Sequence, residues 1–245
     1  MMYIILPAFN ESKVLGKLID EIEMVCASFE HKILVINDGS DDTTADIIRT
    51  KKARYSLTDI HHAKRQGLGS SMHDGLYHIK PLLKDDDLIV TMDADGTHDP
   101  ALIPVMRNRC THDCMLVVAS RYQRGGGEIG VPFSRSLCSR IANHLMHRWF
   151  PIKHIHDYTS GYRMYCGNLL KKGFEHYGEN LITEKGFTCM AEIIIKLGFL
   201  SDQFDEIPLV LRYDLKQTKS TMPVGSTIIR YIFLWNNLRL LRSQN

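Results

Sequence analysis

The sequence predicts an α/β protein built on a mostly parallel sheet flanked by helices. Short runs rich in Ile, Val and Leu alternate with stretches whose apolar residues recur at helical spacing. Polar clusters follow three of these runs directly, at the point where parallel strands end and where such sheets bind ligands. A chain of 245 residues that is 44% hydrophobic has ample material for the core of this fold.

The expected elements follow in order along the chain. Runs of apolar residues predict strands over 3–6, 32–36, 59–62, 88–92 and 115–119. Apolar residues three or four positions apart, such as Val14, Leu18 and Ile22, indicate a buried helix face. This spacing, or its equivalent, predicts helices over 14–25, 43–51, 68–79, 133–149 and 190–197.

Composition narrows the class of function. A net charge of +2 provides no strong field for nucleic acid, so we expect no nucleic-acid partner. Of the six scattered cysteines only Cys110 and Cys114 are close in sequence, and no second pair completes a zinc set, so we expect reduced thiols. No stretch reaches the ~18–20 apolar residues of a membrane span. We therefore expect a cytoplasmic protein.

The pair Asp93-Ala94-Asp95 ends the apolar run 88–92. Two carboxylates so close cannot both be buried without partners, because an unpaired buried charge is costly. At a strand exit they can converge on Mg²⁺ or Mn²⁺, which prefer oxygen ligands. The same pair also occurs in solvated turns. Its neighbours favour the site: clusters at 7–11 and 37–40 follow two other predicted strands and should share its edge of the sheet.

The second half carries segments of a different character. Three glycines at 125–127 favour a mobile loop. The predicted helix 133–149 is amphipathic and basic, so it either packs on the core with a solvated face or lies on an anionic membrane. The stretch 228–242 is apolar, aromatic and basic, which suits docking on lipid or on a membrane-embedded partner.

Seven elements in order resemble the family 2 inverting glycosyltransferases with the GT-A fold, and within them the polyprenyl-phosphate sugar synthases of the dolichyl-phosphate mannose synthase type. They are Pro-Ala-Phe-Asn-Glu at 7–11, Asn-Asp-Gly-Ser at 37–40, Gly-Leu-Gly at 67–69, Asp-Ala-Asp at 93–95, Ser-Arg-Tyr at 120–122, Thr-Ser-Gly-Tyr-Arg at 159–163, and Arg212 before Lys219-Ser220. The resemblance covers residues 6–222. It implies a Rossmann-like sheet and an enzyme that moves a hexose, mannose or glucose, from a GDP- or UDP-sugar to a dolichyl or undecaprenyl phosphate, with inversion and with Mg²⁺ or Mn²⁺.

The resemblance also implies a domain plan. A single catalytic domain is expected over 1–212, with a nucleotide-binding half at 1–122 and an acceptor half at 123–212 that contains the helix 132–149. A basic and apolar segment follows at 213–245.

Site residues carry over by position. The nucleotide-sugar contacts implied are Pro7, Ala8, Phe9, Asn10, Glu11, Asp38, Gly67, Leu68, Asp93, Ala94, Arg212 and Lys219. Lys216 competes with Lys219 for the last of these roles. Asp95 is the principal metal ligand, assisted by Asp93 and by Thr97, which stands where the family usually has glutamine; water, His98 or Asp99 are the alternatives. Arg121, Arg135 and Ser139 match the acceptor-phosphate residues, and arginine suits this role because its planar fork binds phosphate bidentately. The resemblance implies Asp95, Arg121 and Arg135 as the catalytic set.

The nature of the acceptor decides the mechanism. A lipid monophosphate, with a second pKa of ~6, is largely ionised and requires no general base. A sugar hydroxyl requires one, for which Glu184 and Glu192 are candidates. Asp157 is expected to pair with a nearby cation. Two rival functions remain: a family 2 enzyme that glycosylates a polysaccharide or glycolipid hydroxyl, and an inert nucleotide-sugar-binding subunit of a membrane complex. We expect peripheral attachment to the cytoplasmic face of a membrane, through helix 133–149 and the C-terminal segment or through a small membrane subunit.

Overall fold

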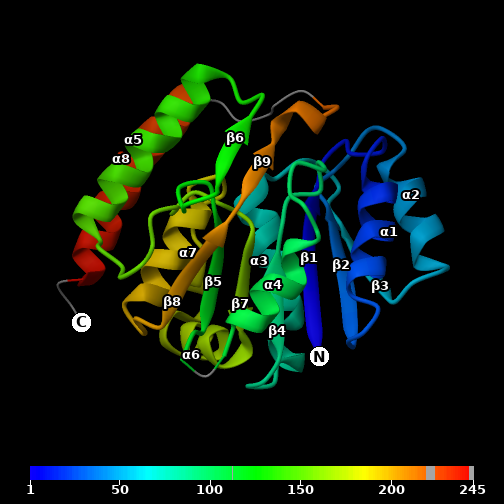
Figure 1. Ribbon diagram of the computed structural model, residues 1–245, viewed down its shortest axis with the longest axis horizontal. Helices are drawn as coiled ribbons and strands as arrows, with labels where there is room; N and C mark the ends of the chain where they lie inside the picture. The colour runs from blue at the N-terminus through cyan, green and yellow to red at the C-terminus, as the bar shows by residue number, and fades with distance from the viewer. Residues whose placement is uncertain (112, 219–223, 243–245) are drawn as a thin grey trace.

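The computed structural model describes residues 1–111, 113–218 and 224–242, apart from the side chains of 224–229 and 242. A central sheet has the strand order β3-β2-β1-β4-β7-β5-β8 (Figure 1). Its strands are β1 (Met2–Ala8), β2 (His31–Asn37), β3 (Leu57–His61), β4 (Leu88–Thr91), β5 (Leu116–Ser120), β7 (Arg163–Cys166) and β8 (Phe204–Pro208). β6 (Gly127–Ile129) and β9 (Val210–Arg212) pair in parallel as a separate two-stranded sheet.

Strand β7 is the exception in a sheet whose other neighbouring pairs are parallel. It runs antiparallel between β4 and β5, with Arg163 beside Thr91 and Val118. The segment that precedes β7 therefore lies at the edge where the parallel strands end. The predicted α/β class with a mostly parallel sheet is confirmed, and β7 adds residues 157–161 to the face that carries the polar clusters.

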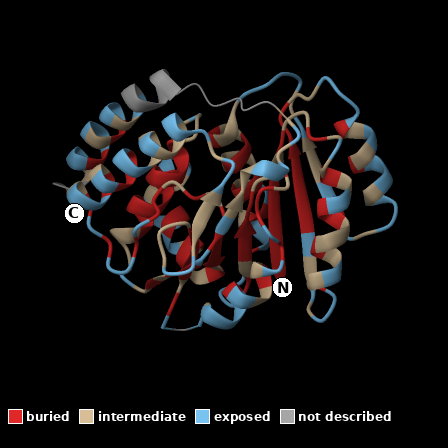
Figure 2. Ribbon diagram, turned by 45° about the horizontal axis from the view of Figure 1, so that its top comes forward, coloured by how far each residue is buried: buried red, intermediate tan, exposed pale blue. Residues whose placement is uncertain are grey.

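Helices cover both faces of the sheet, and the buried strands lie between them (Figure 2). α1 (Leu15–Val25), α2 (Thr44–Lys52) and α4 (Leu102–Arg109) contribute to the core on one face. α3 (Leu68–Ile79), α5 (Phe133–Trp149), α6 (Gly167–Tyr177), α7 (Cys189–Gly198) and α8 (Val224–Arg242) contribute to the core on the other. Short 3₁₀ turns are η1 (Lys80–Leu82), η2 (Gly178–Leu181) and η3 (Tyr213–Leu215). The five helices expected from spacing are present, with ends within one or two residues of the prediction.

The expected glycine loop is correct for Gly125 and Gly126, which lie in a turn, and wrong for Gly127, which opens strand β6 and pairs with Val210. The mobility of this loop stays a prediction. Gly126 lies in a tight turn, where an added Cβ would come within 2.6 Å of the Ser120 carbonyl oxygen. These glycines allow two backbone segments to approach closely.

The C-terminal helix α8 lies beside α5. Leu234 and Leu238 are buried in the core, and the rings of Trp149 and Trp235 lie 5.1 Å apart between centroids. None of the described helices combines the length and the apolar character required to cross a bilayer.

Candidate active site

The exit of β4 carries the Asp-Ala-Asp pair into a short, well-bonded turn. Ala94 and Asp95 are buried. The backbone N–H and the hydroxyl of Thr97 donate to Asp95 Oδ1 at 3.1 and 2.7 Å. Thr97 therefore lies beside the expected metal site and orients the principal carboxylate.

Lys216 reaches this turn from the segment after β9. Its Nζ donates to Asp95 Oδ2, and the side chains of Lys216 and Asp95 are 14% and 11% exposed. Burial by itself would raise the pKa of Asp95, but the charge and hydrogen bond of Lys216 outweigh it, so this pKa falls below its usual value. Of the two lysines that compete for the late basic position, Lys216 lies at the turn. Lys219 lies outside the described residues.

Arg212, the other late cation, occupies a different place. Its backbone N–H donates to the Thr97 carbonyl at 3.1 Å, which ties β9 to the turn. Its guanidinium instead binds Asp214 at 2.8 Å and is 44% exposed. The structure thus places Lys216, and not the Arg212 side chain, against the carboxylates.

The donors at the β4 exit fit a hard divalent cation. Asp93 and Asp95 supply carboxylate oxygens, the ligand type that Mg²⁺ and Mn²⁺ prefer. Within 1–111, 113–218 and 224–242, no three His, Cys, Asp or Glu side chains are grouped to hold a metal. Two carboxylates suit the mode in which Mg²⁺ is bound by one or two protein carboxylates together with substrate phosphates. His98 supports the turn, because its Nδ1 accepts from the Asp93 N–H at 3.1 Å and its ring stacks on Tyr162 at 5.0 Å.

Glu11 connects the N-terminal cluster to this centre. The Thr218 hydroxyl donates to its two carboxylate oxygens at 3.1 and 3.3 Å. Burial and the negative charge of Asp95, partly offset by Lys216, raise the pKa of Glu11 to about 7. This acid is therefore divided between its neutral and charged forms near neutral pH.

The loops after β1 and β2 are locked together by side chains. Asn10 adopts a left-handed conformation with φ 58°, which asparagine tolerates. Its side chain exchanges two hydrogen bonds with Asp41, at 2.7 and 3.0 Å, and its N–H donates to Ser40 at 2.9 Å. Phe9, in the same loop, lies under the Arg65 guanidinium at 4.4 Å. These contacts hold Pro7 to Glu11 at the edge of the sheet.

Asp38 is buried and holds the loop that precedes α3. Its oxygens accept from the backbone N–H groups of Gln66 and Gly67, each at 2.8 Å, and lie 2.7 Å from His62 Nδ1. The carboxylate oxygens of Asp38, an expected nucleotide-sugar contact, are thus bonded within the protein, and its donor-binding role stays a prediction.

The glycines at 67 and 69 also have a structural partner. Gly67 has a φ of 100°, and a Cβ on Gly69 would lie 1.8 Å from the Glu184 carbonyl oxygen. Gly69 N–H donates to the Lys185 carbonyl at 2.9 Å. The family resemblance implies Gly67 and Leu68 as nucleotide-sugar contacts, whereas here the two glycines, with Leu68 between them, allow the approach of segment 184–185. Their nucleotide-binding role stays a prediction.

Arg121 is the most extensively bonded cation of the site. Its Nε and NH2 groups donate to Asp157 at 2.8 and 2.7 Å, NH2 also donates to Thr159 at 2.6 Å, and NH1 donates to Glu128 at 2.9 Å. Burial would raise the pKa of Asp157, but the Arg121 charge and hydrogen bonds lower it overall. The expectation that Asp157 pairs with a cation is confirmed. Sequence patterns did not identify Glu128, since nothing in the sequence distinguishes it from a surface acid.

Arg135 and Ser139 extend the polar surface along α5. Arg135 NH1 donates to the Tyr213 hydroxyl at 2.8 Å, and the Ser139 hydroxyl lies 3.1 Å from that of Thr159 and 3.2 Å from that of Tyr122. Tyr213 was not predicted either, because it lies between the matched residues Arg212 and Lys219 and its contact depends on the turn η3.

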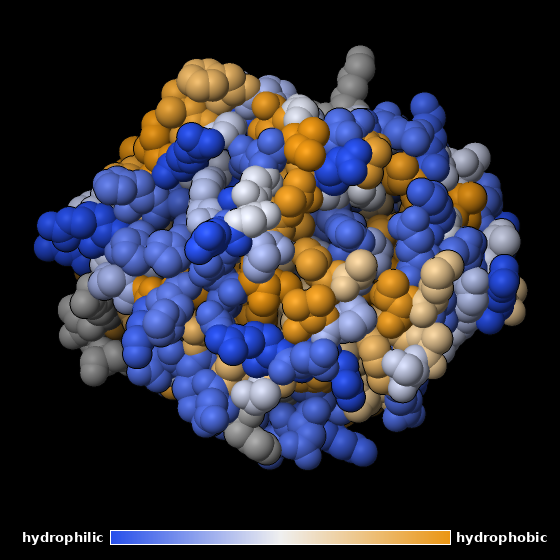
Figure 3. Space-filling model, viewed as in Figure 1, coloured by the Kyte–Doolittle hydropathy of each residue, from blue (hydrophilic) through white to orange (hydrophobic). Residues whose placement is uncertain are grey.

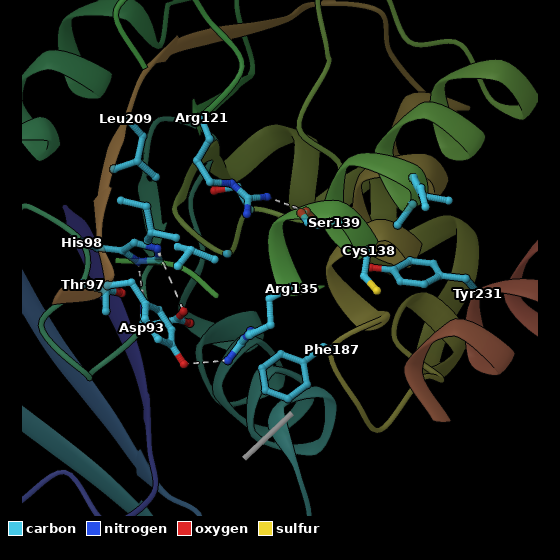
Figure 4. A pocket seen from close by; sticks show the side chains of 18 of the residues that line it. Asp93, Thr97, His98, Arg121, Arg135, Cys138, Ser139, Phe187, Leu209 and Tyr231 are labelled. Carbon is cyan, nitrogen blue, oxygen red and sulfur yellow. Dashed lines mark hydrogen bonds and ion pairs between the residues drawn. The ribbon is translucent and has the colours of Figure 1, made fainter. Parts of the chain in front are cut away.

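These groups meet in a cavity of about 400 Å³. Figure 4 shows Asp93, Thr97 and His98 on one side, Arg121 and Arg135 in the middle, and Cys138, Phe187 and Tyr231 beyond them. The cavity walls include all the predicted metal and acceptor residues together with Lys216. The remote part is apolar and is lined by Ile141, Leu145, Trp149, Phe187, Tyr231 and Ile232.

The two acids considered as general bases do not line this cavity. Glu192 is buried in an ion pair with Lys196 at 2.5 Å, and it accepts from the N–H groups of Thr183 and Glu184 at 2.9 Å. Glu184 accepts from the Thr188 hydroxyl at 2.5 Å. Both stabilise the segment that leads into α7.

Comparison with known proteins identifies the family. Residues 3–174 match the family model described as glycosyl transferase family 2. The chain belongs to this family. It is 28% identical to a dolichol-phosphate mannosyltransferase of Pyrococcus furiosus over 94% of its length, and 29% identical to an undecaprenyl-phosphate mannosyltransferase of Micrococcus luteus over 94%. A polyprenol monophosphomannose synthase of Mycolicibacterium smegmatis is 30% identical over 69% of the chain. The chain spans 61%, 92% and 63% of these three relatives.

Solved structures share the fold of this family 2 chain. Glucosyl-3-phosphoglycerate synthase from Mycobacterium tuberculosis, in complex with Mn²⁺, UDP and phosphoglyceric acid, superposes with a TM-score of 0.73 at 16% identity, covering 97% of this chain and 78% of that one. Its complex with Mn²⁺, UDP and glucosyl-3-phosphoglycerate gives 0.71 at 17% identity, with 97% and 79% covered. The predicted GT-A fold is thereby confirmed.

Proposed function

We propose that this family 2 chain transfers a hexose, mannose or glucose, from a GDP- or UDP-sugar to a polyprenyl phosphate, with inversion and with Mg²⁺ or Mn²⁺. The observation that carries the proposal is the two-part cavity. Its polar end joins two carboxylates, Lys216 and two arginines, and its other end is an apolar channel between α5 and α8. A molecule with one phosphate and a long hydrocarbon chain matches both ends. The three relatives that act on polyprenyl phosphates by name support the same class of acceptor.

The residues take complementary roles. Arg121, Arg135 and Ser139 orient the acceptor phosphate, whose oxygen attacks the anomeric carbon as the bond to the nucleoside diphosphate breaks. Lys216 neutralises charge on the departing diphosphate. Asp93 and Asp95, beside Thr97, would hold a divalent cation, which would supply Lewis-acid stabilisation of that diphosphate. Pro7 to Glu11, Asp38, Gly67, Leu68 and Ala94 shape the donor side.

The cavity favours a phosphate over a hydroxyl acceptor. Among the described residues, Asp93 and Asp95 are the carboxylates that line it, and both are assigned to the donor. A hydroxyl acceptor requires a base for its proton, whereas an ionised phosphate does not. Glu192, a candidate base for a hydroxyl acceptor, is held in a buried ion pair with Lys196. This pairing further supports a lipid phosphate as the acceptor.

Peripheral attachment to a cytoplasmic membrane face is part of the proposal. Phe133, Ile232 and Phe233 on α5 and α8 are 80%, 53% and 62% exposed. Figure 3 shows apolar side chains gathered along the upper left edge, where Figure 1 places these two helices. An apolar helix face flanked by arginines is typical of helices that lie at a lipid interface.

Direct assay tests the function. Purified protein is incubated with Mn²⁺, a panel of labelled GDP- and UDP-hexoses, and a short-chain polyprenyl phosphate. A labelled product that is soluble in chloroform is expected, and Asp95→Ala should abolish it. Transfer to a sugar acceptor instead of the lipid would favour the hydroxyl alternative, and undiminished product from Asp95→Ala would contradict the assigned centre.

A further inference from the structure

A second cavity of about 390 Å³ lies at the far ends of α5 and α8. It is lined by Arg148, Trp149, Phe150, Pro151, Trp235 and Arg239. Trp149 also lines the apolar end of the first cavity. The second cavity therefore adjoins the apolar end of the proposed acceptor site.

Both charged side chains that line this second cavity are arginines. Arg148 and Arg239 are exposed, and neither forms an ion pair with a carboxylate of the residues described. The Arg239 guanidinium lies 5.5 Å from the centroid of the Trp235 ring, and Trp149 packs on Trp235. Two arginines in one cavity, one of them stacked over an aromatic ring, favour an anion of phosphate type.

Exposed apolar residues near the second cavity favour a lipid phosphate over a free phosphate ion. Ile141 and Ile232, along the same two helices, are 50% and 53% exposed, and Leu240 next to Arg239 is 64% exposed. Tryptophan prefers the boundary between headgroups and hydrocarbon. A free phosphate ion would use the arginines but would leave this apolar face in water.

We propose that the second cavity binds the phosphate headgroup of an anionic phospholipid, so that α5 and α8 lie on an anionic leaflet. Arg148 and Arg239 contact the phosphate, and Trp149 and Trp235 lie at the level of the glycerol backbone. The apolar end of the acceptor cavity then opens toward the acyl chains. The inference rests on the proposed function in taking the acceptor as a membrane lipid and α5 and α8 as the membrane-facing helices.

The chain's own fluorescence reports this contact, because its two tryptophans are Trp149 and Trp235. Full-length protein is titrated with vesicles of phosphatidylcholine alone and of phosphatidylcholine with phosphatidylglycerol in equal parts. A blue shift of emission, and quenching by lipids brominated near the headgroup, are expected with the anionic vesicles. An unchanged tryptophan signal with those vesicles would overturn the proposal.

Charge removal gives the second test. Arg148→Ala with Arg239→Ala should weaken binding to anionic vesicles about 30-fold, taking about 1 kcal/mol for each arginine near the surface. The matched control is Arg54→Ala with Arg107→Ala, since each of these exposed arginines also lies over an aromatic ring, at 5.0 and 5.1 Å. Circular dichroism verifies that both variants are folded. Equal weakening by the control pair, or none by the cavity pair, would refute a specific site.

An activity assay with a water-soluble acceptor tests the proposed function separately from the headgroup site. With a water-soluble short-chain polyprenyl phosphate and no vesicles, Arg148→Ala/Arg239→Ala should retain wild-type turnover. Product without a tryptophan response to vesicles refutes the headgroup site alone. A tryptophan response without product from the wild type refutes the proposed function and leaves the headgroup site supported.

Discussion

Lys216 and Asp95, 121 positions apart in the chain, form a buried ion pair at the end of β4. The pair fastens the segment after β9 over the exit of a central strand. It also means that the carboxylate best placed for a divalent cation already has a positive partner from the protein. The proposed diphosphate site is thus built with a cation that can transfer its contact from Asp95 to a substrate phosphate.

Lys216→Met tests this arrangement through two effects of opposite sign. Removal of the ammonium group leaves the Asp95 carboxylate without its positive partner. Mn²⁺ should therefore bind the nucleotide-free variant more tightly than the wild type, as measured by calorimetric titration. Turnover should fall about 100-fold, because a preorganised charge next to the leaving group is lost. Lys17→Met, which removes a surface lysine paired with Glu21 at 3.2 Å, is the control and should change neither. Weaker Mn²⁺ binding by Lys216→Met would contradict the interpretation.

Asp157→Asn should destabilise the fold through Arg121. Loss of one partner from a buried pair costs about 3–5 kcal/mol, measured as a fall in the free energy of unfolding in urea. Glu128→Gln removes the other carboxylate on Arg121, whose side chain is 11% exposed, and should cost less. Because folding lowers the pKa of Asp157, this stabilisation is present above its unfolded pKa of ~3.9 and is lost as the pH falls through the folded value. Equal losses in the two variants would argue against Asp157 as the principal support.

Replacing Glu11 with glutamine should change the free energy of unfolding with a pH dependence opposite to that of the Asp157 contribution. Folding raises the pKa of Glu11 from 4.5 to about 7, so the folded state binds this proton more tightly than the unfolded state. The carboxyl therefore destabilises the wild type increasingly from pH 4.5 to 7. Relative to wild type, Glu11→Gln should gain unfolding free energy across this interval and level off above it, as urea midpoints will show. Glu21→Gln is the control on an exposed acid, and a pH-independent difference for Glu11→Gln would contradict the raised pKa.

Mild oxidation should join Cys110 to Cys166, whose sulfur atoms lie 2.9 Å apart. The hydrogen bond from Cys110 lowers the pKa of Cys166 and favours its thiolate. That thiolate attacks hydrogen peroxide to form a sulfenic acid, and the Cys110 thiol then displaces water to form the disulfide. Thiol titration after denaturation should fall by two, and peptide mapping should leave Cys26 and Cys189, both buried, as thiols. A Cys166→Ser protein should lose the cross-link, and a different pairing in the wild type would contradict the assignment.

Much of the fold and the position of the site could be predicted because the signals are local. The spacing of Val14, Leu18 and Ile22 requires a helix with one buried face, and the run 88–92 requires a buried strand. The carboxyl ends of parallel strands lie at the same edge of a sheet. The clusters at 7–11, 37–40 and 93–95 could therefore be placed together from the sequence. The strands after residue 120 were missed because β6, β7, β8 and β9 have three to five residues each and no alternating apolar pattern.

By itself, therefore, the sequence determined the α/β class, the family resemblance and the residue types that meet at the sheet edge, because each follows from patterns within a few turns or strands. The tertiary structure alone decided how those residues are partnered. It placed Lys216 rather than the Arg212 side chain on Asp95, gave Asp38 to the loop before α3, and enclosed Glu192 with Lys196 away from the cavity. Such partners are distant in sequence or depend on which way a short segment turns. They are set only when the inverted strand β7 and the helices α5 and α8 pack into place.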